Sequence, residues 1–171
     1  MSMLSDLLQH PDGYALCLSP GFFRFYALMG VIEALHDNKC LAAKSVSGSS
    51  AGALVGGFLA SGMPIAEMPE RVFAIKRADI WDVGVGFGVL KGQLFQSILE
   101  AQLPVSTFEQ CAIPIGVTAY DLFGFRTACL TAGNLSSHHA CIFRVRLNTH
   151  SLPHTSSNIY CIYIIPYNHY R

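Results

Sequence analysis

The sequence is poor in charged residues and has no excess of either sign. Charged residues make up 13% of the 171 residues, and the formal net charge is zero. A nucleic-acid-binding protein needs a basic surface that neutralises phosphates, and this composition provides none. It also argues against strong attraction to an anionic membrane, although an apolar surface can still reach lipid. We therefore expect no nucleic-acid partner.

Long apolar runs and closely spaced metal ligands are also lacking. Charge, Gly or Pro interrupts each apolar segment before the roughly 20 residues of a membrane span. Residues 1–11 have no long apolar core and include Asp6, so they do not resemble a signal peptide. The six cysteines have neither zinc-ligand nor disulfide-framework spacing, and the histidines are irregularly placed. We expect no transmembrane segment, metal or other cofactor, and a reducing, cytoplasmic setting.

What the sequence does contain is enough apolar residues, 51% of the chain, to bury a core. Apolar β-prone segments alternate with segments of helical spacing, which predicts an α/β fold with a mostly parallel sheet. The predicted strands cover residues 14–19, 43–47, 113–120 and 126–131, and the predicted helices cover 25–37, 51–60, 65–77 and 90–103.

Residues 48–52 are the most informative stretch, because they read Gly-Ser-Ser-Ala-Gly between a predicted strand and a predicted helix. That context is typical of a nucleophile elbow, a tight turn that needs small residues around a strained central residue. Ser50 would then stand at a helix N-terminus, where backbone dipoles stabilise developing negative charge. Gly48, Ser49, Ala51 and Gly52 are its small neighbours. The alternative is a plain small-residue turn, which the flanking strand and helix make less probable.

A second turn, residues 20–24 (Pro-Gly-Phe-Phe-Arg), follows the predicted strand 14–19. Two successive strand–turn–helix units predict parallel strands, whose C-terminal turns lie side by side at one edge of the sheet. An acyl-transfer enzyme needs such a pair of turns. One turn holds the nucleophile, and the other offers backbone N–H groups to the oxyanion.

Several ordered segments resemble the patatin-like phospholipases. They are the turn and helix at 18–31, the elbow at 47–53, and residues 90–92, 113–122 and 131–135. The resemblance implies a three-layer patatin-like core and a Ser–Asp dyad that hydrolyses acyl esters, mostly of lipids. A lipid or acyl-ester substrate, and peripheral contact with a membrane or lipid droplet, follow from the same resemblance.

The resemblance also assigns roles to particular residues. It makes Ser50 the nucleophile and places the backbone of Gly21, Phe22 and Phe23 in the oxyanion hole, with Arg24 as the basic residue of the turn. The turn departs from the family's Gly-rich pattern, because Phe22 stands where the family has Gly. Phe25 replaces Gly as well. Two interpretations of these phenylalanines stay open: they strain the turn, or they line an acyl pocket.

The catalytic Asp of the family is missing. In the family it belongs to an Asp-Gly-Gly or Asp-Gly-Ala step, and this sequence has neither after the elbow. Asp121 is the last acidic residue of the chain, in a segment that the family does not use as its base. His138 and His139 are a weaker substitute, because adjacent residues point apart on a strand and nothing places them near Ser50.

The resemblance ends near Leu135, where a tail rich in His and Tyr begins. We therefore expect an N-terminal segment at 1–13, a C-terminally incomplete patatin-like domain at 14–135, and a poorly ordered tail at 136–171 that adds little native packing. Two functions follow. The first is a serine acyl hydrolase with weak or no activity for lack of the Asp, and the second is a non-catalytic fragment that binds a lipid or a partner.

Overall fold

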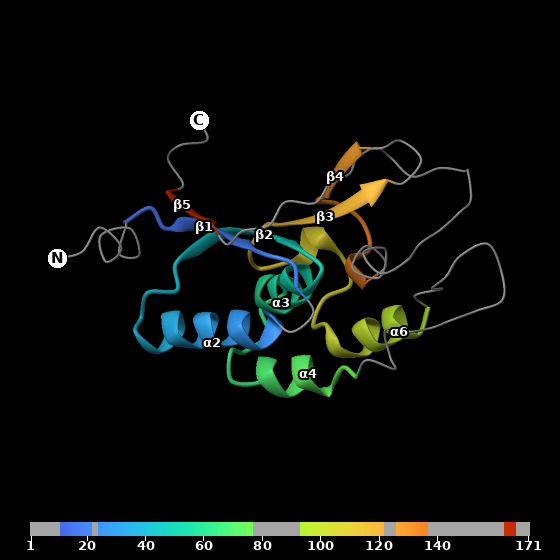
Figure 1. Ribbon diagram of the computed structural model, residues 1–171, viewed down its shortest axis with the longest axis horizontal. Helices are drawn as coiled ribbons and strands as arrows, with labels where there is room; N and C mark the ends of the chain where they lie inside the picture. The colour runs from blue at the N-terminus through green and yellow to red at the C-terminus, as the bar shows by residue number, and fades with distance from the viewer. Residues whose placement is uncertain (1–10, 22–23, 77–92, 122–125, 137–162, 167–171) are drawn as a thin grey trace.

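The fold centres on a five-stranded sheet, described in a computed structural model that covers residues 11–21, 24–76, 93–121, 126–136 and 163–166 (Figure 1). The strand order is β4-β3-β2-β1-β5. The central strands β1, β2 and β3 are parallel, and the outer strands β4 and β5 pair antiparallel with their neighbours. The strands are β1 (Tyr14–Leu18), β2 (Ala43–Ser49), β3 (Ile115–Asp121), β4 (Arg126–Leu130) and β5 (Tyr163–Pro166).

Helices connect the parallel strands. The helical elements are α2 (Arg24–Asp37), α3 (Ala51–Ala60), α4 (Met68–Ala74), α6 (Gln93–Gln102) and the 3₁₀ helix η1 (Phe108–Gln110). The helix predicted over 65–77 is shorter than expected. It has Pro69 in its first turn, where proline is tolerated, and it ends where Ile75 takes an extended backbone with ψ of 110°. None of the helices in the described ranges is long and apolar enough to cross a membrane.

The α-helices of the described residues, α2, α3, α4 and α6, lie on one side of the sheet (Figure 1). Strands β1, β2 and β3 follow one another in a single direction, so right-handed crossovers place both α2 and α3 on the same face. The opposite face carries small, half-buried residues such as Cys17, Ser47 and Thr118. Within the described residues, the α/β fold thus supplies two of the three layers expected for a complete patatin-like core.

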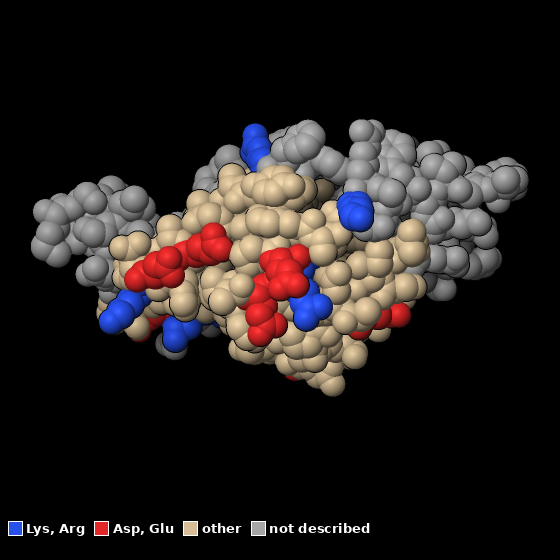
Figure 2. All heavy atoms as spheres, turned by 90° about the horizontal axis from the view of Figure 1, so that it is seen from below, with Lys and Arg blue, Asp and Glu red and all other residues tan. Residues whose placement is uncertain are grey.

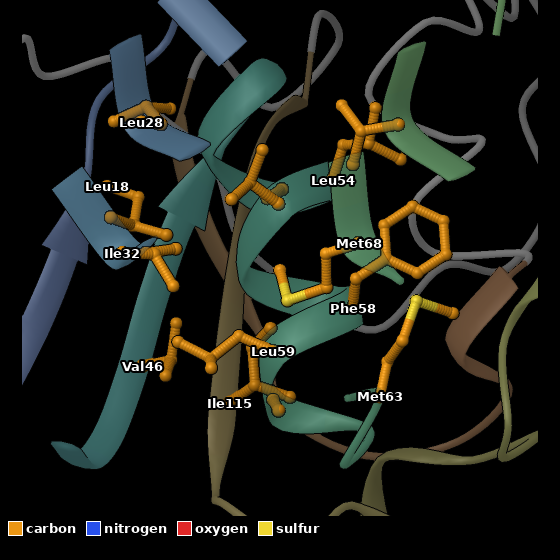
Figure 3. Close-up of a cluster of buried hydrophobic side chains, with 14 of the residues drawn as sticks. Leu18, Leu28, Ile32, Val46, Leu54, Phe58, Leu59, Met63, Met68 and Ile115 are labelled. Carbon is orange, nitrogen blue, oxygen red and sulfur yellow. The ribbon is translucent and has the colours of Figure 1, made fainter. Parts of the chain in front are cut away.

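Helix α3 lies at the centre of the core. All ten of its residues are buried, between the sheet on one side and α2 and α4 on the other. Gly56 lets the helix approach the sheet, because a β-carbon there would lie 2.9 Å from the side chain of Val46. Figure 3 shows part of this cluster, where buried side chains of β1, β2 and β3 face those of α2, α3 and α4. The labelled residues are Leu18, Leu28, Ile32, Val46, Leu54, Phe58, Leu59, Met63, Met68 and Ile115.

The segment after β4 packs against η1. The backbone N–H of Phe108 donates to the Gly133 carbonyl at 3.0 Å, and the N–H of Leu135 donates to the Ser106 carbonyl at 2.9 Å. The Glu109 carboxylate accepts a bond from the Gly133 N–H at 2.9 Å. With Leu135 fully buried, these bonds fix the last part of the region that we assigned to the patatin-like domain.

One part of the tail contributes to the sheet. Strand β5 pairs antiparallel with the outer edge of β1, with Tyr14 opposite Pro166 and Cys17 opposite Tyr163. This pairing differs from our expectation that the tail adds little packing. It arises because β1 presents a free edge that a β-prone segment can extend. The boundary at residue 135 itself stays a prediction, since residues 137–162 lie outside the described ranges.

Candidate functional site

Ser50 joins β2 directly to α3 and has an unusual backbone conformation. Its φ is 50° and its ψ is −120°, whereas β2 ends at Ser49 and α3 begins at Ala51. Among the described residues only Lys39 shares a positive φ without being glycine. Such a conformation costs on the order of 1–3 kcal/mol and persists only when the surroundings hold it. This strained strand–turn–helix geometry is the one that the predicted nucleophile elbow requires.

The glycines on either side of Ser50 are explained by close backbone packing. A β-carbon at Gly48 would contact the Gly52 carbonyl oxygen and lie 2.6 Å from the backbone nitrogen of Ala53. A β-carbon at Gly52 would contact the Leu18 carbonyl oxygen and lie 2.8 Å from that of Ser19. The first turn of α3 therefore folds back onto β2 and also rests against the end of β1.

The two adjacent serines differ in their environment. Ser49 is buried, with 8% of its surface exposed, while Ser50 is only partly buried. The Ser50 carbonyl accepts the first bond of α3 from the Leu54 N–H at 3.0 Å, but its side chain forms no capping hydrogen bond. The Ser50 hydroxyl thus stands at the positive end of the helix without being used to cap it.

The turn after β1 lies beside this elbow, as the parallel topology predicted. Ser19 is buried, and its carbonyl oxygen lies against Gly52. Gly21 has a φ of 144°, a backbone conformation that favours glycine. The Arg24 N–H donates to the Gly21 carbonyl at 2.9 Å, and the Arg24 side chain covers the open face of that glycine. The expected roles of Phe22 and Phe23 fall on residues outside the described ranges.

Two side-chain hydrogen bonds that the sequence did not suggest tie β2 to its neighbours. The Ser47 hydroxyl donates to the Cys17 sulfur at 3.0 Å, and the Thr118 hydroxyl donates to the Gly48 carbonyl at 3.2 Å. Each joins residues on adjacent strands that lie far apart in the sequence. Only the strand register brings them together, so no local motif could have indicated them.

A general base for Ser50 is not apparent in the described part of the chain. There the Ser50 hydroxyl forms no hydrogen bond with a carboxylate or an imidazole. Asp121 is the last residue of β3, three positions beyond Thr118, which pairs with Ser49. It stands at the same edge of the sheet as Ser50, in register with Arg126. The other proposed bases, His138 and His139, lie outside the described residues.

Within the described ranges, we find no competing site built on cysteine thiols or metal ligands. Burial raises the pKa of the Cys111 and Cys129 thiols, and the nearby Glu109 carboxylate raises that of Cys111 further. A nucleophilic cysteine needs a lowered pKa, so these two thiols are not activated. Among the residues that the structure describes, no three His, Cys, Asp or Glu side chains gather in a way that could hold a metal ion.

Comparison with known proteins identifies the family of the chain. Residues 16–162 match the sequence model of the patatin-like phospholipases, a match that includes both turns and extends beyond Leu135. The structure of VipD from Legionella pneumophila is similar over 52% of this chain, with 29% identity and a TM-score of 0.45. That similarity spans only 16% of the VipD chain. The match over most of its length shows that this chain belongs to the patatin-like phospholipase family.

Proposed function

We propose that this chain is a serine acyl hydrolase of lipid esters in which Ser50 is the nucleophile. The backbone of Ser50 carries the proposal, because φ of 50° and ψ of −120° between a parallel strand and a buried helix match a nucleophile elbow. A plain turn would relax to an ordinary conformation, since a left-handed serine stores strain. Membership of a lipid hydrolase family supports the choice of substrate.

The reaction follows from this geometry. The Ser50 oxygen attacks the carbonyl carbon of the ester, a base accepts the hydroxyl proton, and the carbonyl oxygen becomes an oxyanion. The backbone N–H groups of Gly21, Phe22 and Phe23 are the proposed donors to that oxyanion. The alcohol then leaves with a proton, and water attacks the acyl-serine to release the acid.

We further propose that this chain is weakly active or inactive on its own. No described group acts as a base for Ser50, and the sequence lacks the Asp step of the family. Loss of a general base typically slows such a reaction about 10²–10⁴-fold. Ester hydrolysis should therefore be near background, even if the elbow is intact. The missing base also supports the alternative function, in which the chain is a non-catalytic fragment that binds a lipid or a partner.

A patch of exposed aromatic rings supports peripheral contact with lipid. Tyr26 on α2 and Phe73 on α4 are 53% and 42% exposed, with ring centroids 4.6 Å apart, and Phe25 lies beside them. The patch adjoins the turn that leads from β1 into α2. Figure 2 shows this helical side of the molecule with acidic and basic side chains scattered over a mostly uncharged surface. Contact through the patch would thus depend on apolar insertion, with little dependence on anionic lipid.

Labelling with a fluorophosphonate tests the nucleophile, because this probe reacts with an activated serine even when turnover is slow. Ser50→Ala should abolish labelling, and Ser49→Ala should leave it largely intact since Ser49 is buried. Equal labelling of the two variants would reject Ser50. Labelling without turnover of short-chain and phospholipid esters is the expected result for the wild-type chain. Rapid turnover that depends on Ser50 would reject the proposed lack of a base.

A further inference from the structure

We propose that Thr118 is a positioning residue for the Ser50 nucleophile, an inference that rests on the proposed function. Its hydroxyl donates to the carbonyl of Gly48 at 3.2 Å. Gly48 lies two residues before Ser50, and Thr118 is the register partner of Ser49, in the last β2–β3 pair before the turn. Thr118 therefore holds β2 at the point where the chain leaves the sheet.

The elbow needs a restraint at this point. On the helix side, Ser50 is fixed by the bond from Leu54 and by the packing of Gly52 against β1. On the strand side, Gly48 pairs with Leu18 of β1 and Val117 of β3 but has no side chain to restrict its torsions, so the added bond from Thr118 limits rotation that would release the strain at Ser50. The Thr118 hydroxyl fixes the orientation of the Gly48 carbonyl, and with it the peptide plane that leads into Ser49.

The choice of residue is consistent with this role. Any β-branched side chain would suit a strand at position 118, and valine would serve as well for packing alone. The hydroxyl group is what reaches Gly48, from the sheet face opposite the helices. Small errors of position matter here, because a displacement of about 1 Å at a reacting group can slow a reaction as much as 10²-fold.

The matched control is Ser47. Its hydroxyl donates a hydrogen bond to the sulfur of Cys17 at 3.0 Å, on β1, the strand on the other side of β2 from β3. Sulfur is a weak acceptor, and this bond does not touch Gly48. Ser47→Ala therefore removes a hydroxyl from the same strand and the same sheet face without loosening the peptide before Ser49. Thr118→Ser keeps the donor, while Thr118→Val removes it with little change in shape.

The test measures the rate of fluorophosphonate labelling of Ser50 as a function of probe concentration, which separates the maximal rate from the binding constant. Thr118→Val should lower the maximal rate on the order of 10-fold with the binding constant unchanged. Thr118→Ser and Ser47→Ala should stay within about 2-fold of wild type, since their donor to Gly48 is intact. A wild-type rate in Thr118→Val, or an equal loss in Ser47→Ala, overturns the inference. Urea unfolding checks that each variant folds, and Thr118→Ala replaces Thr118→Val if the latter does not.

Amide hydrogen exchange distinguishes this inference from the proposed function. In Thr118→Val the amides of Ser49, Ser50 and Ala51 should exchange faster than in wild type and in Thr118→Ser. If no variant is labelled but this exchange difference is present, Thr118 holds the elbow and the proposed nucleophile is wrong. If the wild type is labelled and the exchange rates of Thr118→Val are unchanged, the elbow is held by other contacts and the inference fails.

Discussion

Substituting Gly52 with alanine should damage both halves of the site at once. The new β-carbon would contact the Leu18 carbonyl oxygen and lie 2.5 Å from its carbonyl carbon and 2.8 Å from the Ser19 oxygen. All three atoms belong to the backbone, so no side chain can rotate away. Reaching ordinary contact with the carbonyl carbon requires a shift of about 0.9 Å between α3 and the end of β1.

Two opposing effects determine how much Gly52→Ala changes the free energy of unfolding. Overpacking a close contact costs about 1–3 kcal/mol, and a rigid backbone neighbour favours the upper end. Alanine in place of glycine near the start of a helix recovers at most about 1 kcal/mol. We therefore expect Gly52→Ala to lower the free energy of unfolding by about 2 kcal/mol. Because the shift moves Leu18 and Ser19, fluorophosphonate labelling of Ser50 should slow as well.

Gly30 on α2 provides the control. A β-carbon there meets nothing within 4 Å, so Gly30→Ala should raise the free energy of unfolding by roughly 0.5–1 kcal/mol through chain entropy alone. Urea unfolding of both variants, followed by the labelling assay, measures the contrast. Equal unfolding midpoints for Gly52→Ala and Gly30→Ala would falsify the tight contact between the elbow and β1.

Three other perturbations test separate parts of the molecule. Ser50→Gly should be more stable than Ser50→Ala by about 1 kcal/mol in urea unfolding, because glycine adopts a φ of 50° without strain; equal stabilities would contradict the strain. Burial raises the pKa of Tyr14, whose hydroxyl donates to the Cys40 carbonyl at 2.7 Å, so its contribution to stability is complete below about pH 10 and is lost at higher pH. Tyr14→Phe should thus cost about 1–3 kcal/mol at pH 8 and progressively less above pH 10, and a pH-independent difference would refute this. Ending the chain at Ser136 removes β5 and opens the edge of β1, so size-exclusion chromatography should show more oligomer than for the full chain, and an unchanged profile would argue against the β1–β5 pairing.

The strand–turn–helix unit at Ser50 and the turn after β1 were predictable from the sequence because each depends on a few consecutive residues. Gly48 and Gly52 are needed by local packing, and the strands and helices around them have clear apolar patterns. Helix α3 illustrates the limit of such patterns. Every one of its residues is buried, so its sequence carries no polar face that would show which side meets the sheet.

Two contacts between distant segments were not predictable. The bond from Thr118 to Gly48 depends on strand register across 70 positions of sequence. The pairing of β5 with β1 depends on which edge of the sheet is free, which no local pattern specifies. The helix predicted over 65–77 was too long at both ends, because the apolar spacing continues through Ile65 and Ile75 while the backbone does not.

The order of the elements along the chain has a consequence for how the site forms during synthesis. Strand β1, its turn, α2, β2, Ser50 and α3 all lie between residues 14 and 60, and they contact one another as neighbours in space. All of these elements are synthesised before β3, and N-terminal units fold first as a chain emerges. Strand β3 follows only at residue 115, so Thr118 is synthesised after the residues of the turn. Sequence changes downstream of residue 60 should therefore alter what holds and activates Ser50, while the turn itself is set by the first third of the chain.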